Sequence, residues 1–166
     1  MGELVKFWYN FAMKALIQRV TSASVNVNHQ SIATIQQGLL VLLGVEQGDS
    51  IKIAEAMVKK IVSLRIFNNS QGKFDLSLND VTGDLLMVSQ FTLMADCKKG
   101  ARPSFTAAAA PQIAQPLFDS TVDFAKTITN GSVKTGEFGA NMQVNLANDG
   151  PVTIWLDSHK LFPQLA

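Results

Sequence analysis

The sequence is poor in the residues that most readily form cross-links and metal sites. It has one cysteine, Cys97, and two histidines, His29 and His159, among 166 residues. A single cysteine excludes an internal disulfide framework and fits a reducing compartment, so we expect a cytoplasmic protein. Because the histidines and the cysteine show no ligand spacing, we expect no metal and no other cofactor.

Charged residues and long apolar runs are also scarce. Charged residues make up 16% of the chain against 47% hydrophobic residues, and the net charge is +1. This composition is typical of a globular domain whose surface is partly covered by a partner, most simply a second copy. A nucleic acid could bind only through a local basic patch, and we expect no DNA partner. No apolar run reaches the ~20 residues of a membrane helix, so we expect no membrane partner.

The length of the chain suits one compact domain and is too short for two ordinary ones. The first twelve residues mix charged and polar side chains with apolar ones and do not resemble a signal peptide. Met13 begins a segment that reads like a second natural start. We therefore predict an extension over residues 1–12 and a single domain over residues 13–166.

The periodicity of apolar residues predicts the secondary structure. We expect helices from Asp49 or Ser50 to about residue 64 and from Pro111 to near Gly131, and strands over 15–27 (with a break near Ser22), 31–36, 39–45, 84–95, 133–138, 142–146 and 152–156, with a hairpin over 67–78. The order of strands, helix, strands, helix and strands predicts an α+β domain. Its sheet should be mostly antiparallel and curled or barrel-like, with two main helices packed on it.

The predicted strand over 84–95 combines a run of apolar residues with three hydrogen-bonding side chains, Ser89, Gln90 and Thr92. Buried polar groups need partners, so this strand either holds an internal hydrogen-bond network or faces a pocket. The sequence alone leaves both explanations open, and the first is the commoner one for an arbitrary strand.

The motifs of common hydrolases and nucleotide-binding proteins are missing or incomplete. A triad of Ser89, His159 and Asp157 is arithmetically possible, but no G-x-S-x-G turn surrounds the serine, and we expect both histidines of the chain at the surface. Neither a P-loop nor a complete dinucleotide-binding motif is present. The pair Gly150-Pro151 follows Asp149 in an ordinary turn pattern, yet it could also form a rigid binding wall of exposed carbonyl groups.

Two segments together resemble the paired signatures of the D-aminoacyl-tRNA deacylases. They are Ser89-Gln90-Phe91-Thr92-Leu93 and Asn148-Asp149-Gly150-Pro151-Val152-Thr153. The similarity runs from Met13 to about Leu156 and includes segments 15–20, 38–45, 65–67, 99–105 and 138–144. The resemblance implies a homodimer with active sites at its interface. It implies hydrolysis of the ester of D-aminoacyl-tRNA, and of mischarged glycyl-tRNA, as proofreading in translation.

The resemblance also implies how chirality is selected. Gly150 and Pro151, joined by a cis peptide, would project from one subunit into the pocket of the other and form the chiral filter. Rigid carbonyls there would collide with an L side chain while a D side chain points outwards, which is specificity by rejection. Arg19, a charged residue in the opening strand, would brace this loop.

The same resemblance assigns the pocket to residues 89–92. Ser89 would help to bind the aminoacyl ester, and backbone amides near Gln90 and Phe91 would stabilise the oxyanion of the reaction. Thr92 could be a nucleophile, a water-orienting group or part of the wall. We favour a supporting role, because no base stands near Thr92 in the sequence to activate its hydroxyl.

The phosphates of the tRNA need basic side chains. Lys98, Lys99 and Arg102, in the loop after the central strand, are the best candidates, although an ordinary solvated loop would look the same. Two other functions stay open on the sequence: a non-catalytic module that binds the 3′ end of tRNA, and a small serine or threonine esterase on a non-RNA substrate.

Overall fold

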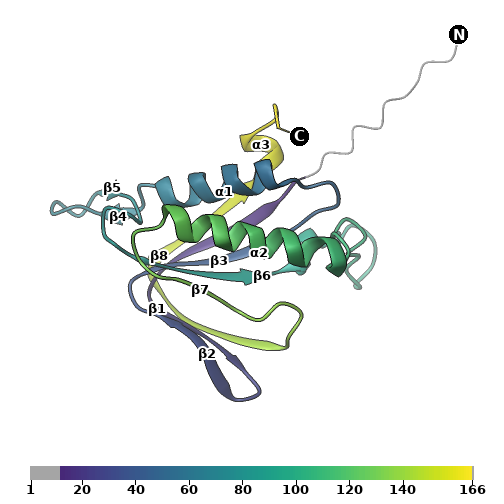
Figure 1. The fold of residues 1–166 in the computed structure, drawn as a ribbon, viewed down its shortest axis with the longest axis horizontal. Coiled ribbons are helices and arrows are strands. Elements are labelled where there is room, and N and C mark those ends of the chain that lie inside the picture. Colours follow the sequence, from purple (N-terminus) through teal and green to yellow (C-terminus); the bar gives the residue numbers. More distant parts are fainter. Residues whose placement is uncertain (1–11, 166) are drawn as a thin grey trace, which may run out of the picture.

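Two helices lie over one face of a strongly curved sheet in the computed structural model, which describes residues 12–165 (Figure 1). They are α1 (Ile51–Ser63) and α2 (Pro111–Ile128), and they pack against each other. Of the extension predicted over residues 1–12, all but the last residue lies outside the described residues. No helix within the described range is long and apolar enough to cross a membrane.

The long strand β1 (Lys14–Val27) organises the sheet. One edge of β1 pairs first with β3 (Gly38–Gly44) and then with β2 (Gln30–Ile35), and its other edge pairs with β8 (Met142–Asp157) over its whole length. All three pairings are antiparallel. The sheet therefore curls around β1, as the sequence predicted for a curled or barrel-like sheet.

The sheet continues from β3 to β6 (Asp84–Ser89) and then to β7 (Val133–Thr135), and both of these pairings are parallel. The prediction of a mostly antiparallel sheet is wrong here, because the sheet is mixed. Parallel neighbours need a long crossover connection. The segments that contain α1 and α2 supply it, since α1 lies between β3 and β6 in the chain and α2 lies between β6 and β7.

Two smaller elements complete the described chain. A hairpin of β4 (Phe67–Asn68) and β5 (Phe74–Leu76) projects from the body at the left of Figure 1, where the sequence predicted a hairpin over 67–78. A single helical turn, α3 (Ser158–Leu161), follows β8.

Both main helices begin at the predicted residues. The hydroxyl of Ser50 caps α1 by accepting the N–H of Ile53 at 3.4 Å, which satisfies one of the free amides of the first turn. Pro111 opens α2, where its missing N–H costs no helical hydrogen bond. The apolar faces of the two helices pack on the sheet and form the larger core cluster together with Met13, the inner side of β3 and β6, and part of β8.

Strands β3 and β6 are buried on both faces, as the sequence predicted for its apolar runs. Leu85 and Met87 of β6 belong to the cluster under the helices, whereas Leu86 and Val88 belong to a second cluster inside the curl of the sheet. Side chains alternate between the two faces of a strand. Ser89 therefore follows Met87 toward the helix side.

Asp84 ties neighbouring connections to the first residue of β6. Its carboxylate accepts the backbone N–H of Gln36 at 3.3 Å and both the N–H and the hydroxyl of Ser132, at 3.0 and 2.7 Å. Desolvation alone would raise the pKa of Asp84, but these hydrogen bonds outweigh it and lower the pKa below its usual value. The start of β6 is thus held on both sides.

The predicted strand over 84–95 is too long, because β6 ends at Ser89 and residues Phe91–Met94 form a 3-10 turn, η1. The backbone ladder to β3 finishes where the N–H of Gln90 donates to the carbonyl of Leu43 at 2.8 Å. Beyond this point the chain makes local bonds instead, such as the N–H of Leu93 to the carbonyl of Gln90.

Three further strand predictions differ from the structure. The strands predicted over 142–146 and 152–156 are one strand, β8, because β1 pairs with both parts, and the strand predicted over 133–138 ends at residue 135. The break predicted near Ser22 is also wrong, since β1 is continuous. At this position β1 changes its partner from β3 to β2, and its register with β8 shifts.

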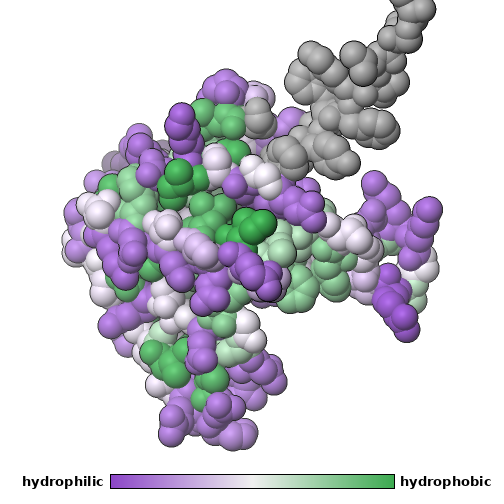
Figure 2. Space-filling view, turned by 45° about the vertical axis from the view of Figure 1, so that its right-hand side comes forward, coloured by the Kyte–Doolittle hydropathy of each residue, from purple (hydrophilic) through white to green (hydrophobic). Residues whose placement is uncertain are grey.

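Apolar side chains also reach the surface, in small groups between hydrophilic ones on the face that Figure 2 shows. The most exposed large apolar residues of the described chain are Ile113, Phe91 and Phe74, each more than half exposed. They come from three separate elements: the first turn of α2, η1 and β5.

Candidate active site

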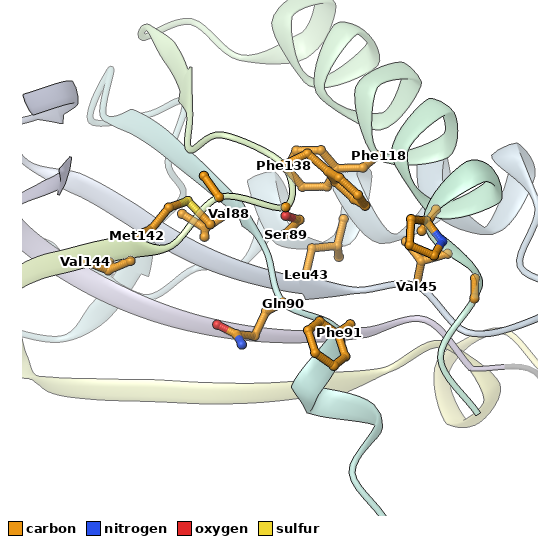
Figure 3. Close-up of a pocket in the computed structure, with 15 residues that line it drawn as sticks. Leu43, Val45, Val88, Ser89, Gln90, Phe91, Phe118, Phe138, Met142 and Val144 are labelled. Atoms are coloured by element: carbon orange, nitrogen blue, oxygen red, sulfur yellow. The ribbon is translucent and has the colours of Figure 1, made fainter. Parts of the chain in front are cut away.

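A cavity of about 380 Å³ lies where β6 ends (Figure 3). Its walls come from the end of β3, the end of β6, the first turns of α2 and the loop between β7 and β8. The lining residues are Leu43, Val45, Val88, Ser89, Gln90, Phe91, Ala109, Pro111, Ala114, Phe118, Phe138, Gly139, Ala140, Met142 and Val144. Only two of these side chains, those of Ser89 and Gln90, are polar, so backbone groups supply most of the polar chemistry that a ligand could meet.

The end of β6 positions the two polar side chains. Ser89 forms the last ladder pair with Leu43, and its hydroxyl points toward the ring of Phe138 in Figure 3. The side-chain amide of Gln90 donates to the hydroxyl of Thr92, two residues on in η1. The sequence left open whether this segment holds an internal network or faces a pocket, and the structure shows both.

Backbone amides at the start of η1 are free to donate. The N–H groups of Phe91 and Thr92 have no acceptor among the described residues, as expected for the first amides of a helical turn. The N–H of Gln90 is already used by Leu43. Of the two amides that the sequence analysis considered for an oxyanion, that of Phe91 is therefore available in this structure and that of Gln90 is engaged.

The side chains of Thr92 and Phe91 lie near the mouth of the cavity. Thr92 is exposed and does not line the cavity, whereas Phe91 does line it and is 58% exposed. The ring of Phe91 meets the ring of Phe105 edge to face, with 5.2 Å between centres. This contact links η1 to the long loop that precedes α2.

Titratable side chains do not line the cavity. His29 lies exposed in the turn between β1 and β2, where its φ is 63°. His159 lies in α3 and is only partly exposed, so the prediction of a surface residue holds fully for His29 alone. Asp157 caps α3 by accepting the N–H of His159 at 3.0 Å. A triad of Ser89 with these residues has no support, because neither of them reaches the cavity lining.

Gly150 and Pro151 lie in a bulge of β8 opposite Arg19. The ladder with β1 runs through the pair Gln18 and Thr153 and resumes at Val20 and Asn148, so residues 149–152 face a single residue of β1. The Gly150-Pro151 peptide is cis, and Gly150 has a φ of 126°, a conformation that L side chains rarely adopt.

Arg19 anchors this bulge through contacts with Asp149. Its Nε lies 3.2 Å from the carbonyl oxygen and 3.1 Å from the carboxylate of Asp149. Its Nη1 donates to the carbonyl of Ile66 at 2.6 Å and to Oδ1 of Asn68 at 3.4 Å. Arg19 is 4% exposed, and these partners compensate a charge that would otherwise be costly to bury.

The bulge and the cavity are separate within one chain. Gly150, Pro151 and Arg19 do not line the cavity that Ser89, Gln90 and Phe91 help to form. Both Gly150 and Pro151 are exposed. The described chain therefore brings together the residues of the first motif, and it presents the second motif elsewhere on its surface.

The three predicted phosphate ligands, Lys98, Lys99 and Arg102, are exposed in the loop between η1 and α2. A backbone bridge between Asp96 and Ser104 closes this loop, with N···O distances of 2.8 and 2.9 Å. Among the described residues none of the three cations forms an ion pair. Phe105, the residue directly after this bridge, contacts the ring of Phe91, which lines the cavity.

Sequence reasoning assigned no role to most of the cavity wall. Phe118 and Phe138 contact each other with 6.3 Å between ring centres and close one side. Gly139, with a φ of 76°, turns the chain there. The signal that could have found this wall is the glycine pair at 136 and 139, which marks a tight loop just before the long strand β8.

Metal ligands do not gather anywhere in the described chain, since no group of three or more His, Cys, Asp or Glu side chains is placed to hold an ion. The fold and the site thus define a small α+β protein with a mainly apolar cavity, lined in part by Phe91, whose backbone N–H is free. The chain belongs to the family described as D-Tyr-tRNA(Tyr) deacylase, whose model matches residues 16–157.

Curated relatives carry a closely related name. The D-aminoacyl-tRNA deacylase of Thermosipho melanesiensis is 53% identical over 90% of this chain and 100% of its own length. The protein of the same name from Clostridioides difficile is 50% identical over the same shares.

Solved structures agree with the fold. One described as c-Myc DNA Unwinding Element Binding Protein is 43% identical, with a TM-score of 0.81 over 86% of this chain and 97% of its own. A probable eukaryotic D-amino acid tRNA deacylase has a TM-score of 0.78 over 88% and 99%. At 16% identity the second likeness shows the fold alone.

Proposed function

We propose that this protein is a D-aminoacyl-tRNA deacylase of the cytoplasm. It hydrolyses the ester between a D-amino acid and the 3′ end of tRNA, releases both, and so protects translation from mischarged tRNA. The observation that carries this proposal is the cavity at the end of β6, where Phe91, whose N–H is free, lies beside Ser89 and Gln90 in an otherwise apolar wall, and the free N–H of Thr92 follows directly in the chain. The name shared by the relatives supports the substrate class.

The proposed mechanism relies on position and on backbone charge. Water attacks the ester carbonyl, its oxygen takes up negative charge, and the bond to the ribose oxygen breaks as that oxygen gains a proton. Amides of Phe91 and Thr92 stabilise the oxyanion, because preorganised donors act strongly in a water-poor site. An aminoacyl ester is already activated and has a neighbouring ribose hydroxyl, so positioning can supply much of the remaining rate.

The hydroxyl of Thr92 has a supporting role in this mechanism. No histidine or carboxylate lines the cavity to take its proton, and its bond from the Gln90 amide orients it within the protein. A nucleophilic hydroxyl needs an adjacent base. We therefore assign Thr92 and Gln90 to the shape and rigidity of the segment that presents the amides.

A homodimer completes the site. The Gly150-Pro151 bulge is exposed and lies away from the cavity of its own chain, so a second copy is needed to bring the two motifs together. In the dimer each bulge enters the cavity of the other subunit. Its rigid carbonyls then collide with an L side chain, whereas glycine has no side chain to reject, so glycyl-tRNA is also a substrate.

The deciding experiment compares purified protein acting on D-Tyr-tRNA and on L-Tyr-tRNA. We expect rapid loss of the D ester with the L ester spared. Equal cleavage of both esters would show that the protein is an esterase without a chiral filter. Binding without cleavage of either would favour a tRNA-end binding module. Inactivation by a serine-directed covalent inhibitor would favour a hydroxyl-based esterase on other substrates.

A further inference from the structure

Phe74 is an exposed aromatic residue that stands over a buried charge. It is the first residue of β5 in the projecting hairpin, and 57% of it is exposed. Its ring lies over the guanidinium of Arg19, with 5.4 Å between Cζ and the ring centre. An aromatic face attracts a cation at this distance, and the attraction strengthens where the cation is desolvated. The Arg19 side chain is 5% exposed whereas Phe74 is more than half exposed, so this contact is partly desolvated.

The hydrogen bonds of Arg19 restrain movement of its guanidinium group within its own plane. Nε is bound to Asp149, and Nη1 is bound to Ile66 and Asn68 at the base of the hairpin. Such bonds lie in the plane of the group and resist tilting only weakly. A ring on the face of the guanidinium restrains the remaining tilt.

The tilt of Arg19 matters because its third nitrogen faces the bulge. Nη2 has no acceptor among the described residues, and a Cβ built on Gly150 would lie 3.1 Å from it. Nη2, together with Cγ2 of Val152 at 2.8 Å from the same Cβ, therefore forms the floor beneath Gly150. A tilt of the guanidinium would move this floor and change the path of the bulge at Gly150 and Pro151.

We propose that Phe74 is a positioning residue for the Gly150-Pro151 bulge, acting through the face of the Arg19 guanidinium. This inference rests on the proposed function, in which the bulge rejects L-aminoacyl esters. Phe74 touches neither the cavity nor the reacting atoms of its own chain. Its effect is to keep the filter narrow enough to separate two substrates that differ only in chirality.

The test measures the ratio of kcat/KM for D-Tyr-tRNA to that for L-Tyr-tRNA in three variants. Phe74→Tyr keeps the aromatic face, Phe74→Leu keeps apolar cover without it, and Phe74→Ala removes both. We expect Tyr to retain the wild-type ratio and Leu and Ala to lower it by about three- to tenfold, the range of a partly desolvated cation–π contact. A merely structural role would lower both rates together and leave the ratio unchanged.

A double-mutant cycle tests whether Phe74 acts through Arg19. Arg19→Lys loses the planar group that the ring covers. Adding Phe74→Ala to this variant should change the ratio no further, whereas additive effects would overturn the proposal. Ile32→Ala, on an exposed residue of β2, is the control and should leave the ratio at the wild-type value.

The outcomes separate this inference from the function on which it rests. If the wild-type protein does not distinguish the two esters, the proposed function fails. If it does, and Phe74→Leu or Phe74→Ala distinguishes them equally well, only the role of Phe74 is overturned. The native mass of each variant is measured alongside, and a loss of the dimer in Phe74→Ala would also overturn the proposal, because assembly would then explain the change.

Discussion

At the scale of single residues, removing the N–H of Phe91 tests whether backbone amides or a side-chain hydroxyl carry the catalysis. Proline can occupy the first position of a helical turn, and it removes only the amide hydrogen from the backbone. Phe91→Pro should therefore lower kcat for D-Tyr-tRNA by roughly 10²–10³-fold relative to Phe91→Ala, which removes the ring but keeps the N–H.

Single-turnover kinetics on the two Phe91 variants would measure this difference, with circular dichroism to check that both fold. Equal rates for the proline and alanine variants would show that this amide does not hold the oxyanion.

Thr92→Ala tests the role of the threonine hydroxyl. It should retain measurable hydrolysis, because its hydroxyl has no base beside it in the cavity.

A second single residue, Asp49, contributes to the dependence of stability on pH. Desolvation by burial, followed by repulsion from Glu46, raises the pKa of Asp49 to about 7, although N–H groups of Glu46 and Met13 and the charge of Lys14 oppose the rise. One carboxylate oxygen, Oδ1, is buried without a hydrogen-bond partner. The folded protein therefore holds the proton of Asp49 more tightly than the unfolded chain does.

The sign of the pH dependence follows from this difference. The unfolded chain loses the proton near pH 4 and the folded protein near pH 7, so the contribution of Asp49 is complete below pH 4 and is lost as pH rises to 7. We expect the free energy of unfolding to fall by on the order of 2–4 kcal/mol across this window, from this group alone. Asp49→Asn should remove the slope, which urea unfolding at several pH values would reveal; an identical slope in the variant would assign it to other groups.

At the scale of elements, the loop between η1 and α2 has the clearest separate task. It is closed by the bridge between Asp96 and Ser104, it touches η1 through Phe105, and it carries three exposed cations. Exposed charges on a closed loop that is joined to η1 are candidates to contact the phosphates of a tRNA whose ester enters the cavity. Under the proposed function, this loop supplies a general attraction for RNA and the cavity supplies the specificity.

This arrangement predicts a change in the salt dependence of tRNA binding. Replacing Lys98, Lys99 and Arg102 by alanine should flatten the plot of log Kd against log salt by about 0.7–0.9 for each phosphate that the variant no longer binds. The control is Lys52→Ala on the exposed side of α1, which should leave the slope unchanged. Filter binding at several salt concentrations would measure the slope for both variants. A slope of the triple variant equal to that of the wild-type protein would show that the phosphate-binding residues lie on another part of the surface.

At the scale of the whole molecule, the bulge and the cavity are separate within one chain, so in the proposed homodimer each site depends on two chains. Two inactive variants should therefore restore activity when they are mixed. Phe91→Pro damages the cavity and leaves the bulge intact, whereas Pro151→Trp adds bulk to the exposed bulge and leaves the cavity intact. Only a heterodimer combines an intact cavity with an intact bulge.

Random exchange of equal amounts should produce heterodimers in half of the molecules, each with one working site. We expect about a quarter of the wild-type deacylation rate, against almost none for either variant alone. Mixing without subunit exchange is the control. No recovery after exchange, confirmed by native mass spectrometry, would contradict a site shared between subunits.

The local elements follow closely from the sequence because short-range patterns decide them. Ser50 and Pro111 mark the starts of both helices, and the run 39–45 marks a strand buried on both faces, as the structure shows for β3. The curled α+β architecture follows too, because apolar faces of this size need cover. Within the site, the motif at 89–93 contains three residues of the cavity lining, and the motif at 148–153 contains the bulge.

Only the tertiary structure decided where these segments end and what they face. Strand β6 stops at Ser89 because β3 offers no further backbone partner, and β8 continues through residues 149–152 because β1 pairs on both sides of them. The contact of Arg19 with the Gly150 bulge and the cover of Arg19 by Phe74 both join residues far apart in the chain. The amino-acid sequence by itself determined where the two main helices begin and which apolar runs form buried strands, and it marked the two motifs on which the proposed chemistry rests. Distant backbone pairing, which no local pattern encodes, decided where the strands end and how the motifs are placed.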